Sequence, residues 1–108
     1  PPVGYALEGP AFTLFDGPSE GLVPLYQSWC AACVDHLQTV NSGEGAPAYG
    51  EEEVLGYCSS AESTSAPQGL FRLHHPSKQD HFVTVDPGEL GTAAALGYVE
   101  EGTICYVP

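Results

Sequence analysis

The sequence has almost no basic side chains and no methionine. Lys78 and Arg72 stand against 14 acidic residues in a chain of 108, which gives a formal net charge of -12 at pH 7. A chain without a basic patch cannot neutralise phosphates, so this composition excludes nucleic acid as a partner and is repelled by anionic lipid headgroups. A neutral ligand carries no such Coulomb penalty, so neutral glycans are the partners that the charge favours.

Long apolar runs are missing as well. No run approaches the roughly 20 residues that a membrane-spanning helix requires, so we expect no membrane insertion. The chain opens on Pro1-Pro2, without the charged and apolar regions of a signal peptide, as a processed mature form would.

Turn-forming residues, unlike basic ones, are abundant. The chain has 13 Gly and 10 Pro beside 43% hydrophobic residues. The apolar content is too high for disorder and the turn residues are too frequent for a helix bundle, so we expect short strands around one small core. Segments 16–21 and 59–69 are rich in Gly, Ser and Pro and are predicted to be surface loops.

Three disulfide pairings are open to the four cysteines, Cys30, Cys33, Cys58 and Cys105. Each bridge would stabilise a small core by about 2 to 4 kcal/mol. The spacing Cys30-Ala-Ala-Cys33 also suits half of a zinc site or a redox pair. No second CxxC, spaced His pair or thioredoxin-like strand and helix accompanies it. We therefore expect structural disulfides, with no metal and no cofactor.

The chain contains an internal repeat with a constant offset of 45 residues, from 25 to 70. The matching dipeptides are Leu25-Tyr26, Asp35-His36, Thr39-Val40 and Gly43-Glu44, which recur as Leu70-Phe71, Asp80-His81, Thr84-Val85 and Gly88-Glu89. Four matches in one register indicate that a single structural unit is used twice.

A second marker, Gly-Tyr, gives the boundaries of the units. It stands at 4–5, 56–57 and 97–98, and the outer copies extend to GYALEG and GYVEEG. We predict a single domain over residues 1–108, with internal units of approximately 4–55 and 56–96 and a partial copy over 97–108. The predicted fold class is α+β and β-rich: two tandem pseudo-repeats of short strands plus one short helix. The outer Gly-Tyr strands would pair, or be equivalent about a pseudo-two-fold axis.

One helix start is well marked in the second unit. Asp86 is an N-cap residue, Pro87 suits the first helical position and Glu89 the third, ahead of an Ala-rich run. Gly97 follows as the predicted C-cap. In the first unit, residues 50–55 occupy the corresponding helical position, with three acidic residues near its start.

The second unit resembles a known family. Between Leu70 and Val107 the segments LFRLHHP, DHFVTVDPGE and GYVEEGTICYV resemble a repeat of secreted bacterial and fungal proteins, whose signature is His-Phe-Tyr-Thr, a helix and Gly-Tyr-x-x-Glu-Gly. The length, acidity and doubled motif are similar to the α-galactosyl-binding mushroom lectin (Lyophyllum decastes lectin) family. The first unit departs from the pattern, since His36-Leu37-Gln38-Thr39 replaces His-Phe-Tyr-Thr.

The resemblance implies a non-catalytic lectin that binds terminal α-galactosides, including galabiose-type glycans. It also implies a homodimer and a secreted or extracellular location, as in a fungal fruiting body. A galactose site needs an aromatic ring for the apolar face of the sugar and a carboxylate that accepts from its hydroxyls. The loops before the two Asp-His pairs supply such groups. The predicted carbohydrate-binding residues are Trp29, Asp35, His36, His74, Asp80, His81 and Tyr98.

Structural roles are open to the same residues. A single Trp in a small domain often packs in the core, and a Tyr after Gly, as at Tyr98, often does the same with its hydroxyl bonded. Asp35 and Asp80 suit hydrogen bonds to the amides of their own loops. His36 and His81 suit hydrogen bonds that order those loops. Arg72 suits an ion pair among many acids or a bond to a sugar oxygen.

Other functional classes have less support. No Gly-x-Ser-x-Gly elbow is present, and a domain of this size offers little depth for raising the pKa of a glycosidase carboxyl group. We therefore expect no enzyme. A metal-binding structural domain using His74, His75 and Asp80 is a further alternative. A protein-binding or protease-inhibitor module without sugar specificity is the main one, and the absence of glycan binding would favour it.

Overall fold

The computed structural model describes residues 12–108. The prediction for GYALEG lies outside the described residues. Six antiparallel strands and one helix follow in the order β1 (Leu22–Cys30), β2 (Asp35–Thr39), β3 (Gly50–Ser59), β4 (Gln68–His75), β5 (Asp80–Thr84), α1 (Pro87–Ala95) and β6 (Val99–Val107). The protein is thus a small β-rich domain with one short helix. No helix within residues 12–108 has the length and apolar character to cross a membrane.

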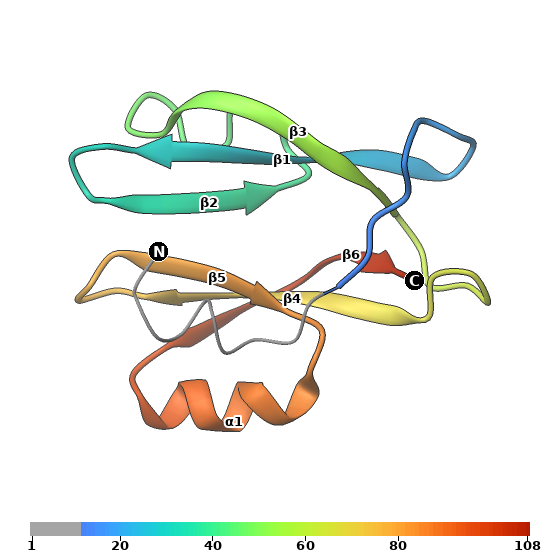
Figure 1. The fold of residues 1–108 in the computed structure, drawn as a ribbon. Coiled ribbons are helices and arrows are strands. Elements are labelled where there is room, and N and C mark those ends of the chain that lie inside the picture. Colours follow the sequence, from blue (N-terminus) through green and yellow to red (C-terminus); the bar gives the residue numbers. More distant parts are fainter. Residues whose placement is uncertain (1–11) are drawn as a thin grey trace.

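The strands form one sheet in the order β2-β1-β3-β6-β4-β5. Its two halves, β2-β1-β3 and β6-β4-β5, are joined at the centre of this order by a single residue pair, Ser59 opposite Tyr106. The outer strands β2 and β5 nevertheless lie side by side (Figure 1). The sheet therefore curls round until its two edges meet, and side chains must connect them because no backbone ladder does.

Each half contains a tight hairpin. Trp29 of β1 lies opposite His36 of β2, and His74 of β4 lies opposite His81 of β5. Side chains alternate between the two faces of a strand, so each opposed pair projects from the same face of its hairpin. The hairpins thus place two pairs of rings, Trp29 with His36 and His74 with His81, in contact.

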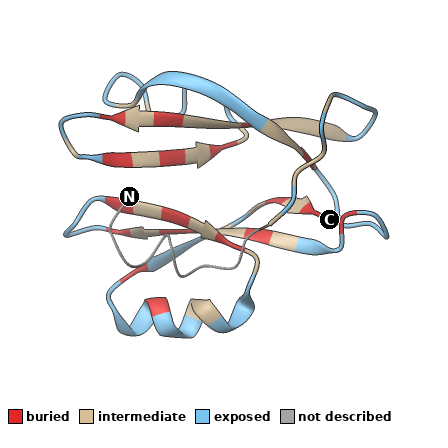
Figure 2. Cartoon of the chain, viewed as in Figure 1, coloured by how far each residue is buried: buried red, intermediate tan, exposed pale blue. Residues whose placement is uncertain are grey.

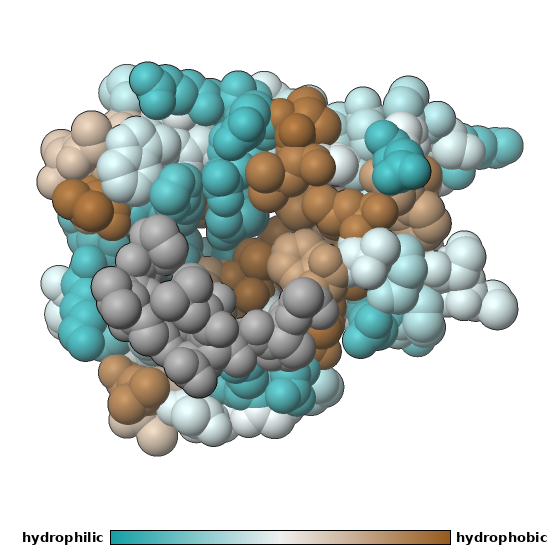
Figure 3. All heavy atoms as spheres, in the orientation of Figure 1, coloured by the Kyte–Doolittle hydropathy of each residue, from teal (hydrophilic) through white to brown (hydrophobic). Residues whose placement is uncertain are grey.

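The main core lies between the two halves. Its buried members are Leu25, Cys58, Leu70, Cys105 and Val107. Figure 2 shows buried segments on strands of both halves, and on the face drawn in Figure 3 hydrophobic side chains gather between them. The disulfide between Cys58 of β3 and Cys105 of β6 crosses this core, while the second disulfide joins Cys30 to Cys33 at the β1–β2 turn.

A smaller core lies under helix α1 and consists of Leu73, Phe82, Ala93 and Tyr98. The predicted helix start is confirmed: the Asp86 side chain accepts a hydrogen bond from the Gly88 amide at 2.9 Å. Gly97 follows the helix with φ of 99°, and a Cβ there would lie 2.7 Å from His75 Nε2. Only glycine therefore fits this turn.

The helix predicted at residues 50–55 is wrong, because these residues belong to strand β3. Val54 pairs with Tyr26 of β1, and Glu53 pairs with Gln27. The backbone groups of β1 that face away from β2 need partners, and this segment supplies them. A chain that must close such a ladder takes the extended form whatever the helix propensity of its acidic residues.

Candidate functional site

A cluster of polar side chains lies where β2 and β5 meet, and we call it the polar seam. Its members are Asp35, Glu44, Tyr49, Arg72, His74, His81 and Glu101. They come from both halves of the sheet. The seam does by side-chain hydrogen bonding what a backbone ladder does elsewhere.

Asp35 is the centre of the seam on the β2 side. Its side chain is buried. One carboxylate oxygen accepts from the His81 amide at 2.9 Å, and the other accepts from His81 Nδ1 and the Tyr49 hydroxyl, both at 2.6 Å. Burial alone would raise the pKa of Asp35, but these hydrogen bonds outweigh it and the pKa is lowered. Burial and the bond to Asp35 raise the pKa of Tyr49, so the tyrosine stays a donor.

Arg72 is the second link and is nearly buried. Its guanidinium donates to the Gln38 carbonyl at 2.8 Å and to both oxygens of Glu44, at 3.1 and 2.7 Å. Its Nε donates to Glu101 Oε1 at 2.8 Å. The ion pair expected for Arg72 is therefore present. One side chain of β4 is thereby tied to strand β2, to the loop after it and to strand β6.

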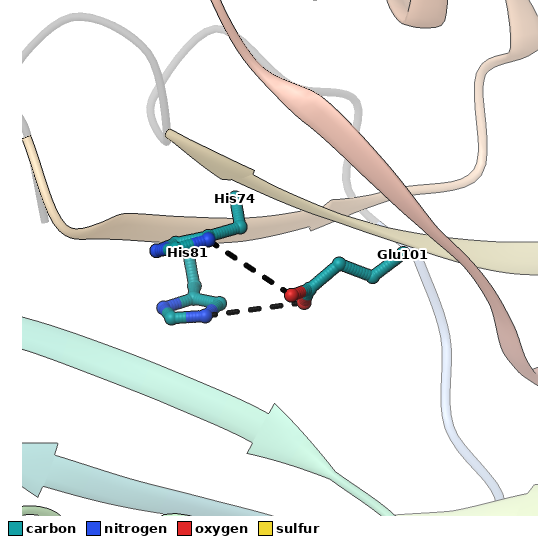
Figure 4. Close-up of side chains that lie close together, drawn as sticks. All are labelled: His74, His81 and Glu101. Atoms are coloured by element: carbon teal, nitrogen blue, oxygen red, sulfur yellow. Dashed lines mark ion pairs between the residues drawn. The ribbon is translucent and has the colours of Figure 1, made fainter. Parts of the chain in front are cut away.

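Three seam residues point toward one another, as Figure 4 shows. The rings of His74 and His81 stack with centroids 4.2 Å apart. The Glu101 carboxylate lies beside them, 4.0 Å from His74 Nδ1 and 3.9 Å from His81 Nε2. Burial, together with the neighbouring His81, lowers the pKa of His74, which favours a neutral ring.

Asp80 occupies the corresponding place on the helix side of the domain. It is buried, with 5% of its surface exposed, and accepts a hydrogen bond from the Tyr98 hydroxyl. Its Oδ1 has no hydrogen-bond partner among residues 12–108. Burial therefore dominates and raises the pKa of Asp80. The pKa of the carboxyl group is thus lowered at Asp35 and raised at Asp80, although both begin an Asp-His pair.

The structure divides the predicted sugar contacts into two groups. Asp35, Asp80 and Tyr98 are buried and hydrogen-bonded within the chain, which favours the structural roles open to them over direct contacts with a ligand. Trp29, His36, His74 and His81 are partly exposed. The Trp29 and His36 rings lie 4.5 Å apart, and His74 stacks on His81, so the structure brings these four together as two separate pairs.

A pocket of about 490 Å³ lies at the loops that the sequence marks only as surface connections. Its walls come from residues 15–22, from the end of β3 and from the loop between β3 and β4. They carry one aromatic ring, two acids and four hydroxyls, from Phe15, Asp16, Glu20, Ser19, Ser59, Ser63 and Ser65. Both acids are exposed, unlike the buried aspartates of the turns.

The opposite pKa directions of the two aspartates predict opposite effects of substitution. Asp35→Asn should lower the free energy of unfolding at pH 7 by about 1.5 to 3 kcal/mol, because bonds to an ionised acceptor are lost. Asp80→Asn should raise it, because a carboxyl group with a raised folded-state pKa destabilises the fold once it ionises. Urea unfolding of the two variants measures both. The effect of Asp80→Asn should shrink on acidification, and equal losses in both variants would contradict this account.

The fold and the site define a small, disulfide-linked β domain whose halves meet at a polar seam. The chain belongs to a family described as a domain of unknown function, DUF5648, whose model matches residues 2–108. No curated protein and no solved structure matches the chain.

Proposed function

We propose that this domain binds neutral glycans at the pocket lined by Phe15, Asp16 and Glu20, without catalysis. Terminal α-galactosides are the first ligands to test, since the sequence resembles lectins of that specificity. The observation that carries the proposal is the makeup of the pocket, in which an aromatic ring, exposed carboxylates and hydroxyls converge.

Each group in the pocket matches a feature of a sugar. The Phe15 ring suits the apolar C–H face of a galactose ring. The carboxylates of Asp16 and Glu20 are acceptors only, so they take hydrogen bonds from sugar hydroxyls. The serine hydroxyls donate and accept, which suits a ligand that does both. The net charge of -12 supports a neutral ligand over an anionic one.

We also infer that the two halves are copies of one unit. Thr39 donates to Glu44 after β2, and Thr84 donates to Glu89 after β5. The same pair of side chains thus orders the chain after each hairpin, at the repeat offset seen in the sequence. A pocket this open binds a single sugar weakly, so we propose that the domain acts as a homodimer that gains avidity from two sites.

The test removes the negative charge of the two acceptors and keeps the shape of their side chains. We expect Asp16→Asn combined with Glu20→Gln to weaken binding of an α-galactoside at least about 10-fold, because hydrogen bonds to charged acceptors each contribute about 1.5 to 3 kcal/mol. Isothermal titration with methyl α-galactoside and a glycan array measure this. Glu62→Gln is the matched control, since Glu62 is exposed on the β3–β4 loop next to Ser63 but does not itself line the pocket.

Two results would contradict the proposal in different ways. Wild-type protein that binds no neutral glycan on the array would remove the lectin function in favour of a protein-binding module. Binding that survives the double substitution but is lost on Trp29→Ala would keep the function and move the site to the exposed ring pair on β1 and β2.

A further inference from the structure

The group His74, His81 and Glu101 has the donors of a metal site. One residue comes from each of β4, β5 and β6, and their nearest ligand atoms all lie within 4.8 Å of one another. Two imidazole nitrogens with one carboxylate oxygen suit a divalent transition metal such as Zn²⁺. They do not suit Ca²⁺, which takes six to eight oxygen ligands.

Asp35 prepares His81 for this role. A carboxylate only accepts hydrogen bonds, so the 2.6 Å contact between Asp35 Oδ2 and His81 Nδ1 places the proton on Nδ1. The neutral ring then carries its lone pair on Nε2, the atom that faces Glu101 at 3.9 Å. A carboxylate that orients a histidine in this way is the usual support of a metal-bound imidazole.

Arg72 holds the third ligand in the same manner. Its Nε donates to Glu101 Oε1 at 2.8 Å, which leaves Oε2 directed at His74 Nδ1. The seam also has an excess of negative charge, since it contains three carboxylates (Asp35, Glu44 and Glu101) and one guanidinium, that of Arg72. With neutral imidazoles the formal sum is -2, which one divalent cation neutralises.

The distances require only a small adjustment. Ligand atoms of a tetrahedral site with bonds of about 2.05 Å lie about 3.3 Å apart, so the separations of up to 4.8 Å must close by about 1.5 Å or less. Side-chain rotation covers this range, and the stacked rings must tilt so that their lone pairs converge. His74 and Glu101 keep 29% and 30% of their side chains exposed, which gives an ion a path from solvent and leaves room for a bound water.

We propose that this chain binds one divalent transition metal ion, with Zn²⁺ as the first to test, through His74 Nδ1, His81 Nε2 and an oxygen of Glu101. The bound ion would tie β4, β5 and β6 together within the seam. This site is separate from the loop pocket, so neither proposal depends on the other.

The experiment titrates tag-free protein with Zn²⁺ alone by calorimetry and compares two phenylalanine variants. His74→Phe keeps a ring stacked on His81 but removes a ligand atom, so we expect affinity to fall at least about 10-fold. His36→Phe is the matched control, because His36 is also a partly exposed histidine packed against an aromatic ring but lies outside the cluster. Its affinity should equal that of the wild type, with one ion bound per chain.

Imidazole resonances give a second measurement that needs no substitution. Adding Zn²⁺ should shift the ring signals of His74 and His81 and leave those of His36 and His75 unchanged. The proposal is overturned if wild-type protein shows no saturable binding, if His74→Phe and His36→Phe lose affinity equally, or if the shifted signals belong to histidines outside the cluster.

Discussion

Replacing Arg72 by methionine is expected to lower the free energy of unfolding by about 3 to 5 kcal/mol. The substitution keeps most of the volume of the side chain but leaves Glu44 and Glu101 without their cation and the Gln38 carbonyl without its donor. A domain of this size has a total stability of about 5 to 15 kcal/mol, so the loss would be a large part of it. Arg72 contributes this much to the free energy of unfolding because its side chain bridges β2, the following loop and β6 at the seam.

Lys78→Met is the matched control for the charge itself. Lys78 is the only other basic residue of the chain and is exposed. If net charge governed stability, the two substitutions would cost the same, since each makes the chain more acidic by one unit. We expect Lys78→Met to change stability by less than about 0.5 kcal/mol in urea unfolding. A loss below about 1 kcal/mol for Arg72→Met would contradict the role of the seam.

Lowering the pH should reduce the difference in the free energy of unfolding between wild type and Arg72→Met. The hydrogen bond from Arg72 holds the pKa of Glu44 below its ordinary value of 4.5. A group with a lowered folded-state pKa contributes stability above its unfolded pKa and loses it as pH falls through the folded one. Unfolding curves below pH 4.5 should therefore converge, while those at neutral pH stay apart.

Local patterns in the sequence predicted much of the fold. The helix start at Asp86, Pro87 and Glu89 and the helix end at Gly97 are marked by residues within one or two turns, so local reasoning finds them. The short strands expected from the frequent turn residues are also present, among them β4 and β5. Where a distant partner decided the outcome, at residues 50–55, local reasoning gave a helix and the structure has a strand.

The polar seam was harder to predict, because its residues come from separate strands and from the loop after β2. Glu101 lies 20 positions after His81 in the sequence and has no motif in common with it. The burial of Asp35, in contrast, has a visible signal. Asp35, Leu37 and Thr39 alternate along one face of β2, and all three are buried. An acidic residue in phase with core residues is better interpreted as a buried hydrogen-bonding group than as a ligand contact.

Removing the Cys58–Cys105 disulfide is expected to cost more than removing Cys30–Cys33. The two bridges have sequence separations of 47 and 3 residues, for which the chain-entropy relation gives about 4 and about 2 kcal/mol. The longer bridge also crosses the main core and joins β3 to β6, whose backbones pair only at Ser59 and Tyr106. Apart from this bridge, the junction is held by that one backbone pair and by the packing of the main core.

Double alanine variants of each pair, compared by urea unfolding under oxidising conditions, measure the difference. The Cys30→Ala, Cys33→Ala variant should keep a cooperative transition, because the hairpin around it retains its backbone pairing. The Cys58→Ala, Cys105→Ala variant should lose more of the free energy of unfolding. It should also open between β3 and β6, so amide exchange should be faster in β6 than in β4. A greater loss of stability in the Cys30→Ala, Cys33→Ala variant would contradict this prediction. It would mean that the β1–β2 turn, and not the junction of the two halves, limits the stability of the domain.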